Sequence, residues 1–175
     1  MDVKVYPYKL SDIDELYSVV SSSADHLRPW MPWLHPGYSQ CDTESWVNKC
    51  IEDWNSGIAY RYVVRSVKTD EIIGSVGLER IVQAHKIAEL GYWIESNSIN
   101  SGAATRAGKK VVSEAFITHG LQRIEINVLT DNAPSNKVAL NIGGLFEGTF
   151  RNKLFHKGRS NAANCYSIVP GDYKI

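Results

Sequence analysis

The chain has 175 residues, of which 43% are hydrophobic and 22% are charged, a composition typical of a folded globular protein. Its 19 Lys and Arg residues balance 19 Asp and Glu residues, so the zero net charge argues against a dedicated nucleic-acid binder. This length suits one domain, which we expect to span residues 1–175.

The first third of the chain predicts one strand and two helices. Residues 2–8 alternate as a strand does, and apolar residues at helical spacing follow Ser11, which predicts a helix with Ser11 as its N-cap. Three prolines in residues 26–37 exclude regular structure there. A second apolar stripe predicts a helix that Thr43 caps and that ends near Gly57.

The rest of the chain alternates between strands and helices. Extended, β-branched runs predict strands, and runs with apolar residues three or four apart predict helices. The last two strands form a hairpin around "HKGR", so we expect an α+β fold. The predicted strands are 60–67, 71–82, 86–95, 123–130, 145–155 and 161–169, and the predicted helices are 104–119 and 132–143.

Cysteine and histidine usage argues against a metal site. Cys41, Cys50 and Cys165 form no C-x-x-C motif, and their odd number argues against a disulfide framework. The histidines show no ligand-like spacing, so we expect no metal. The N-terminus lacks a signal-peptide pattern, and no apolar run approaches the roughly 18 residues of a membrane span. These features predict a cytoplasmic protein.

The junction "GYWIESNSINSGAATRAG" begins as a strand and ends as the first turn of a helix. A helix start presents unpaired backbone N–H groups and partial positive charge, which suits a phosphate or pyrophosphate. Small residues at Gly102, Ala103 and Ala104 allow a ligand to approach closely, and Thr105 adds a hydroxyl. The alternative is a plain strand-to-helix turn, because the stretch matches neither a P-loop nor G-x-G-x-x-G.

Two blocks carry a resemblance to a known family. "AELGYWIES…INSGAATRA" and "LQRIEINVLTDNAPSNKVALNIGGLFEGT" resemble the GNAT acetyltransferase superfamily, in particular its RimL-like branch of ribosomal-protein N-terminal acetyltransferases. The resemblance implies a central mixed, mostly antiparallel twisted sheet flanked by helices, with a splayed strand pair that holds acetyl-CoA. It also implies acetyl transfer from acetyl-CoA to a primary amine by direct attack in a ternary complex.

The resemblance assigns the residues that bind acetyl-CoA. The family's phosphate loop, Gln/Arg-x-x-Gly-x-Gly/Ala, falls on residues 99–104, although Ile99 replaces the Gln or Arg. Asn132 would bind the pantetheine arm, and Ser135 would protonate the departing thiolate; otherwise both simply cap a helix. The expected set is Trp93 and Ile94 through their main chain, Asn100, Ser101, Gly102, Ala103, Ala104, Thr105, Asn132 and Ser135.

Two carboxylates are candidates for the base that takes a proton from the amine. Glu89 and Glu95 lie six residues apart, so both would project from one face of a regular strand. The RimL-like branch carries a carboxylate just after "GYW-x", a position that Glu95 fills. We therefore rank Glu95 slightly above Glu89, and the alternative for either is an exposed strand carboxylate.

The acceptor is open at this stage. Trp30 and Trp33 lie on the Pro-bounded loop that walls the acceptor site in the family, or they pack against the core. The family's Asn-Gly-x-Tyr-x-Asp is absent, and the basic hairpin with Lys157 and Arg159 would suit an acceptor that carries carboxylate or phosphate. The acceptor is a protein N-terminus or a small amine such as an aminoacyl nucleotide, an antibiotic or a polyamine. A CoA-binding module without efficient catalysis is the alternative, and family members are often homodimers.

Overall fold

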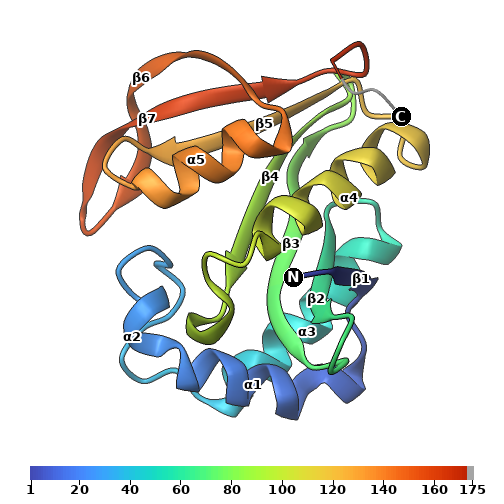
Figure 1. Cartoon of the computed structure of the whole chain (residues 1–175), viewed down its shortest axis with the longest axis vertical. Helices are drawn as coiled ribbons and strands as arrows, with labels where there is room; N and C mark the ends of the chain where they lie inside the picture. The colour runs from blue at the N-terminus through green and yellow to red at the C-terminus, as the bar shows by residue number, and fades with distance from the viewer. Residues whose placement is uncertain (173–175) are drawn as a thin grey trace.

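One seven-stranded sheet organises the computed structural model, which describes residues 1–172 (Figure 1). Its strand order is β1-β2-β3-β4-β5-β7-β6, and only the β4–β5 pair is parallel. This arrangement confirms the expected mixed, mostly antiparallel sheet. The strands are β1 Val3–Pro7, β2 Tyr60–Ser66, β3 Ile72–Val82, β4 Ile87–Ile94, β5 Arg123–Leu129, β6 Leu145–His156 and β7 Arg159–Ile168.

Helices cover both faces of the sheet. Neighbouring strand residues divide between two cores, because side chains alternate across a strand. Val64 packs with Val111 of α4, whereas Val63 packs with Leu16 of α1 and Val47 of α3. The helices are α1 Ile13–Ser22, α2 Ala24–Leu27, α3 Gln40–Asn55, α4 Ala103–Ile117 and α5 Ala133–Ile142, with 3-10 turns at Leu10–Asp12 and Ser96–Ser98.

Two predicted helix caps are wrong. Ser11 lies inside a 3-10 turn, and the turn is closed instead by Asp12, whose Oδ2 accepts from the Lys9 amide at 2.8 Å. Thr43 is buried inside α3, which begins at Gln40 after Ser39. The amide of Ser39 donates to Asp42 Oδ2 at 2.8 Å, so Ser39 and Asp42 fix this helix start.

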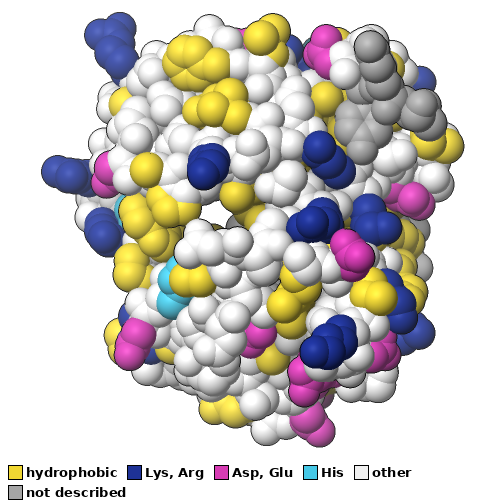
Figure 2. Space-filling model, in the orientation of Figure 1, with side chains coloured by type: hydrophobic (Ala, Val, Ile, Leu, Met, Phe, Trp, Pro, Cys, Tyr) yellow, Lys and Arg dark blue, Asp and Glu magenta, His cyan; other side chains and the backbone are white. Residues whose placement is uncertain are grey.

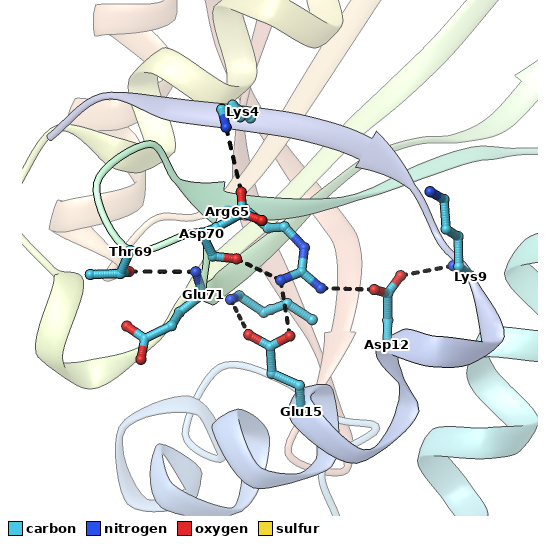
Figure 3. Close-up of polar contacts among 9 residues, drawn as sticks. Lys4, Lys9, Asp12, Glu15, Arg65, Thr69, Asp70 and Glu71 are labelled. Atoms are coloured by element: carbon cyan, nitrogen blue, oxygen red, sulfur yellow. Dashed lines mark hydrogen bonds and ion pairs between the residues drawn. The ribbon is translucent and has the colours of Figure 1, made fainter.

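An ion-pair cluster fastens α1 to the sheet (Figure 3). The guanidinium of Arg65 on β2 reaches Asp12 at 2.8 Å and Glu15 at 2.9 Å. Glu15 also accepts from the backbone amide of Ile72 at 2.6 Å. These contacts hold the start of α1 against β2 and β3. The chain continues through α1 and α2 to the segment at one end of the sheet.

The two halves of the sheet meet at a short seam. Parallel pairing between β4 and β5 runs from Ile87↔Arg123 to Glu89↔Glu125 and stops there. Beyond that point β4 continues to pair with β3, and β5 pairs with β7. The strands therefore diverge, as Figure 1 shows, and the splayed strand pair expected from the resemblance is confirmed.

Candidate active site

A cleft of about 670 Å³ occupies the space between the diverging strands. Its walls come from the segment between α1 and α3, from β3, β4 and β5, from the start of α5 and from the end of β6. Figure 2 shows the surface deeply hollowed between the two halves of the molecule. The cleft thus contacts residues of both sheet faces at the point where β4 and β5 separate.

Ion pairs occupy one wall of the cleft. Glu79 and Glu89 are direct partners on β3 and β4, so their like charges need compensation. Arg61 lies 2.9 Å from Glu79 and 2.6 Å from the buried Asp53, and Arg80 lies 2.6 Å from Glu89. A break in the β3–β4 register and a φ of 51° at Arg80 accompany this arrangement. The irregularity brings Arg80 onto the face that carries Glu89.

The two candidate carboxylates have different positions. Glu89 lines the cleft, with a side chain 22% exposed. Glu95 follows the end of β4 and accepts a hydrogen bond from Ser98 Oγ at 2.7 Å, and it is not among the cleft-lining residues. Strand parity alone placed both on one face, but β4 ends before Glu95 and the chain turns away.

The free backbone amides of β4 also differ from expectation. The Glu95 amide donates to Ile73 of β3 at 2.9 Å, and donors in an antiparallel pair alternate between the two sides of the strand. Trp93 therefore faces β3 with its main chain, and its carbonyl oxygen lies beside Gly74. The amides of Tyr92 and Ile94 face the gap left by β5. Of the two residues expected to offer their main chain, Ile94 therefore faces the gap with its amide and Trp93 faces β3.

A hydroxyl pair lies on the other side of the gap. The hydroxyl of Tyr92 donates to the Ser135 carbonyl at 3.0 Å and lies 3.1 Å from Ser135 Oγ. Asn132 Oδ1 accepts from the Ser135 amide at 3.1 Å, so Asn132 does cap α5. Burial raises the pKa of Tyr92 to about 12, which keeps this hydroxyl protonated at neutral pH. Tyr92 was missed because its contact spans 43 residues.

The junction before α4 is a tight turn whose backbone includes left-handed conformations. Asn100 and Gly102 have positive φ values of 58° and 79°, and Gly102 is the N-cap of α4. Ser101 Oγ donates to the Ser98 carbonyl at 2.6 Å. Arg106 Nη1 would lie 2.5 Å from a Cβ on Gly102, so a guanidinium sits beside the helix start. Ala103, Ala104 and Thr105 form the first turn of α4.

Aromatic rings form a third part of the cleft. Trp33 lies 6.2 Å from Trp93 and 5.8 Å from Tyr38, measured between ring centroids. Trp30 lines the same cleft. Trp46 packs under the Arg61 guanidinium at 4.7 Å, a cation–π contact that supports the ion-paired wall. Both tryptophans of the Pro-bounded loop thus reach the cleft.

Two cleft residues were not anticipated from the sequence. The side chain of Asn127 on β5 has both polar atoms buried, and neither has a hydrogen-bond partner among residues 1–172. The Nε2 atom of His156 on β6 is likewise buried without a partner in that range. Both residues line the cleft. The only sequence signal for Asn127 is a polar residue at an outward position between Ile126 and Val128.

Across residues 1–172, no three His, Cys, Asp or Glu side chains gather closely enough to hold a metal ion. None of the helices in that range has the length and apolar character needed to cross a bilayer.

Comparison with known proteins identifies the family. The acetyltransferase (GNAT) domain model matches residues 3–144. The chain is 38% identical over 109 residues to the uncharacterized N-acetyltransferase YoaA of Bacillus subtilis, a match that spans 62% of each protein. It is 26% identical over 157 residues to the ribosomal-protein-serine acetyltransferase of Escherichia coli, covering 90% of this chain and 87% of that one.

Solved structures of acetyltransferases have the same fold as this chain. The microcin C7 self immunity acetyltransferase MccE, in complex with acetyl-CoA and AMP, is 25% identical, with a TM-score of 0.84 over 96% of this chain and 92% of that one. The ribosomal L7/L12 acetyltransferase RimL, in complex with coenzyme A, shares the fold at 21% identity, with a TM-score of 0.88 over 95% and 93% of the two chains. The chain therefore belongs to the GNAT family of acetyl-CoA-dependent N-acetyltransferases.

Proposed function

We propose that the protein acetylates the α-amine of a peptide, such as a protein N-terminus, by direct attack on acetyl-CoA within a ternary complex. One observation carries the proposal: Glu89 and the Tyr92–Ser135 pair line a single cleft, from opposite faces of the sheet, where β4 and β5 separate. A base for the amine and an acid for the thiolate can thus serve the same reacting centre.

Acetyl-CoA fits the gap between the strands and the start of α4. The amides of Tyr92 and Ile94 would donate to the thioester carbonyl, whose oxygen gains negative charge during attack. The first turn of α4 suits the pyrophosphate, with Asn100, Ser101 and Thr105 around it. Arg106 would add a positive charge, which compensates for Ile99 at the position where the family carries Gln or Arg.

Acetyl transfer requires two proton movements. A neutral amine attacks the thioester carbon, and the surplus proton on nitrogen passes to Glu89, directly or through water. The carbon–sulfur bond breaks, and the CoA thiolate takes a proton from Ser135 Oγ, which Tyr92 can in turn supply. A CoA-like thiol has a pKa of about 8.5, so a nearby acid helps it leave as a thiol. Glu89 thus replaces Glu95 as our preferred base.

The matched pair Glu89→Gln and Glu95→Gln tests this assignment. Loss of a general base costs about 10²- to 10⁴-fold, so Glu89→Gln should lower kcat by at least about 10²-fold. Glu95→Gln should stay within a few-fold of wild type. The measurement is CoA release with acetyl-CoA and an N-terminal peptide, with acetyl-CoA binding checked by calorimetry. Equal losses in both variants, or no loss in Glu89→Gln, would rule out Glu89 as the base.

A small amine acceptor is the second candidate, and a specific observation favours it. Trp33, Trp93 and Tyr38 form an aromatic wall, and the exposed Lys157 and Arg159 lie just beyond the cleft-lining end of β6. Aromatic rings and cations together suit an aminoacyl nucleotide, and one relative binds AMP. The double variant Lys157→Ala/Arg159→Ala should then raise the KM of an aminoacyl-nucleotide acceptor, and an unchanged KM would eliminate this candidate.

A further inference from the structure

Asn127 lies at the point where the sheet opens. Glu125 is the last β5 residue paired with β4, opposite Glu89, and Asn127 follows two residues later on the same face. Ile124, Ile126 and Val128 point the other way, into the core beneath α4. The Asn127 side chain is therefore on the Glu89 side of the sheet, about 7 Å farther along the strand.

The buried polar atoms of Asn127, Oδ1 and Nδ2, have no hydrogen-bond partner among residues 1–172. A buried amide that makes no hydrogen bond opposes folding, so such groups are rare in native proteins. Asn164, by contrast, donates to Asn136 at 2.8 Å and accepts from Thr149 at 2.7 Å. A ligand in the cleft would complete these hydrogen bonds once the Asn127 amide turns toward it, because both atoms are buried as the side chain now lies.

His156 gives an independent second observation. Its Nε2 is buried without a partner, in the same cleft, although it comes from β6 and not from β5. Two separate elements thus place residues with unmet polar atoms along one cleft. The aromatic wall of Trp33 and Trp93 lines the same space, so the cleft combines apolar surface with a few polar groups, as ligand sites do.

We propose that Asn127 binds the first peptide group of the acceptor and that His156 binds a polar group farther along the acceptor chain. This inference rests on the proposed function, in which the acceptor amine lies at Glu89. An Asn side chain offers one acceptor and donors side by side, which matches the N–H and C=O of a peptide group. One extended residue spans about 3.5 Å, so a peptide with its amine near Glu89 brings its first peptide group toward Asn127. Asn127 therefore favours an α-amine next to a peptide bond over a simple polyamine.

The first test varies the acceptor and the residue together. Initial rates are measured with acetyl-CoA and three acceptors: the peptide Ser-Ala-Ala-amide, its analogue with an ester in place of the first peptide N–H, and spermidine. Wild type should prefer the peptide over the ester about tenfold, the effect of one hydrogen bond. Asn127→Ala should lose about tenfold with the peptide, almost entirely in KM, and should no longer distinguish peptide from ester. Asn48→Ala, which removes an exposed amide on α3, is the matched control.

The outcomes separate the two proposals. Equal loss on the peptide, the ester and spermidine would overturn the role of Asn127 and leave the proposed function standing. A wild-type preference for spermidine, or no discrimination against the ester, would overturn it as well. If wild type acetylates no peptide, the proposed function fails first, and the inference fails with it.

A stability measurement guards against a trivial folding defect. Asn127→Leu replaces unpartnered polar atoms with apolar ones of similar size, so its Tm should equal or exceed that of wild type while peptide acetylation falls. A lower Tm with uniformly reduced activity would indicate a structural role and overturn the proposal. His156→Leu should remove the advantage of Ser-Ala-Ala-amide over serine N-methylamide, and an unchanged ratio of the two rates would eliminate the contact with His156.

Discussion

The two walls of the cleft treat polar groups in opposite ways. On the paired wall, formed by Arg61, Glu79, Arg80 and Glu89, every charged side chain has a partner within 2.9 Å. On the open wall, formed by Asn127 and His156, buried polar atoms have none among residues 1–172. The charges of the paired wall are therefore already compensated in the folded protein. The polar atoms of the open wall are buried without hydrogen bonds, which opposes folding. Such an arrangement indicates a binding site more strongly than the paired wall does.

Removal of Arg61 should break the paired wall and give the largest effect. Its guanidinium is the partner of Asp53, whose side chain is 5% exposed, and of Glu79. Loss of Arg61 leaves the buried Asp53 with the exposed Lys49, 3.1 Å away, as its cation, so Arg61→Leu should lower the free energy of unfolding by about 3 kcal/mol, the lower end of the cost of breaking a buried pair. Chemical denaturation measures this. Arg80→Leu is the control, because its exposed pair should cost below about 1 kcal/mol. Similar losses in the two variants would contradict the contrast in burial.

Substitutions at two glycines should distinguish an effect on stability from an effect on acceptor binding. Gly77 and Gly91 are cross-strand partners, but a Cβ on Gly77 would lie 3.0 Å from Arg61 Cγ, whereas one on Gly91 would meet nothing within 4 Å. Gly91→Val should lower kcat/KM for the acceptor about tenfold or more by displacing it from attack geometry, with acetyl-CoA affinity and Tm unchanged. Gly77→Ala should instead lower stability, by about 1–2 kcal/mol.

Steady-state rates, calorimetry and thermal melts on the two glycine variants test this division. If Gly91→Val melts earlier than Gly77→Ala, or retains full acceptor kcat/KM, the open side of the sheet is not where the acceptor binds.

The smallest effect concerns a partnered histidine outside the cleft. His119 stacks on Tyr60 with ring centroids 3.6 Å apart, and burial lowers its pKa from 6.5. The unfolded chain therefore takes up a proton more readily, so the contribution of His119 is complete above about pH 6.5 and is lost as the pH falls through the lowered pKa. The Tm of wild type should drop more between pH 7.5 and 5.5 than that of His119→Phe. Parallel curves would show that His119 does not titrate differently on folding.

Sequence patterns predicted the order of the elements because that order depends on local periodicity. The long strands and helices repeat every two or every 3.6 residues, and α4 starts at Ala103, one residue from its predicted start. Helix caps were less predictable, because several hydroxyl residues compete. Ser39 followed by Asp42 was a readable signal for the start of α3, but Thr43 was preferred.

The site was predictable only in part. Asn132, Ser135 and the turn at Gly102 were assigned through a family resemblance; in the structure Asn132 and Ser135 line the cleft, and Gly102 precedes α4. The preference for Glu95 rested on the family resemblance, and strand parity, which placed Glu89 and Glu95 on one face, does not reveal where β4 ends. The Tyr92–Ser135 contact, the Arg80–Glu89 pair and the unmet atoms of Asn127 arise between segments distant in sequence, and no local pattern encodes them.

The seam between β4 and β5 has a consequence for how the molecule moves. Strands β1 to β4 and strands β5 to β7 form two successive stretches of the chain, and within residues 1–172 only three residue pairs of the sheet join them. Few backbone hydrogen bonds therefore join the two units across the sheet, although both units contribute side chains to the core beneath α4. A molecule bound across the gap would couple the two units. Amide hydrogens of both halves should then exchange more slowly when acetyl-CoA is bound, including those far from the cleft.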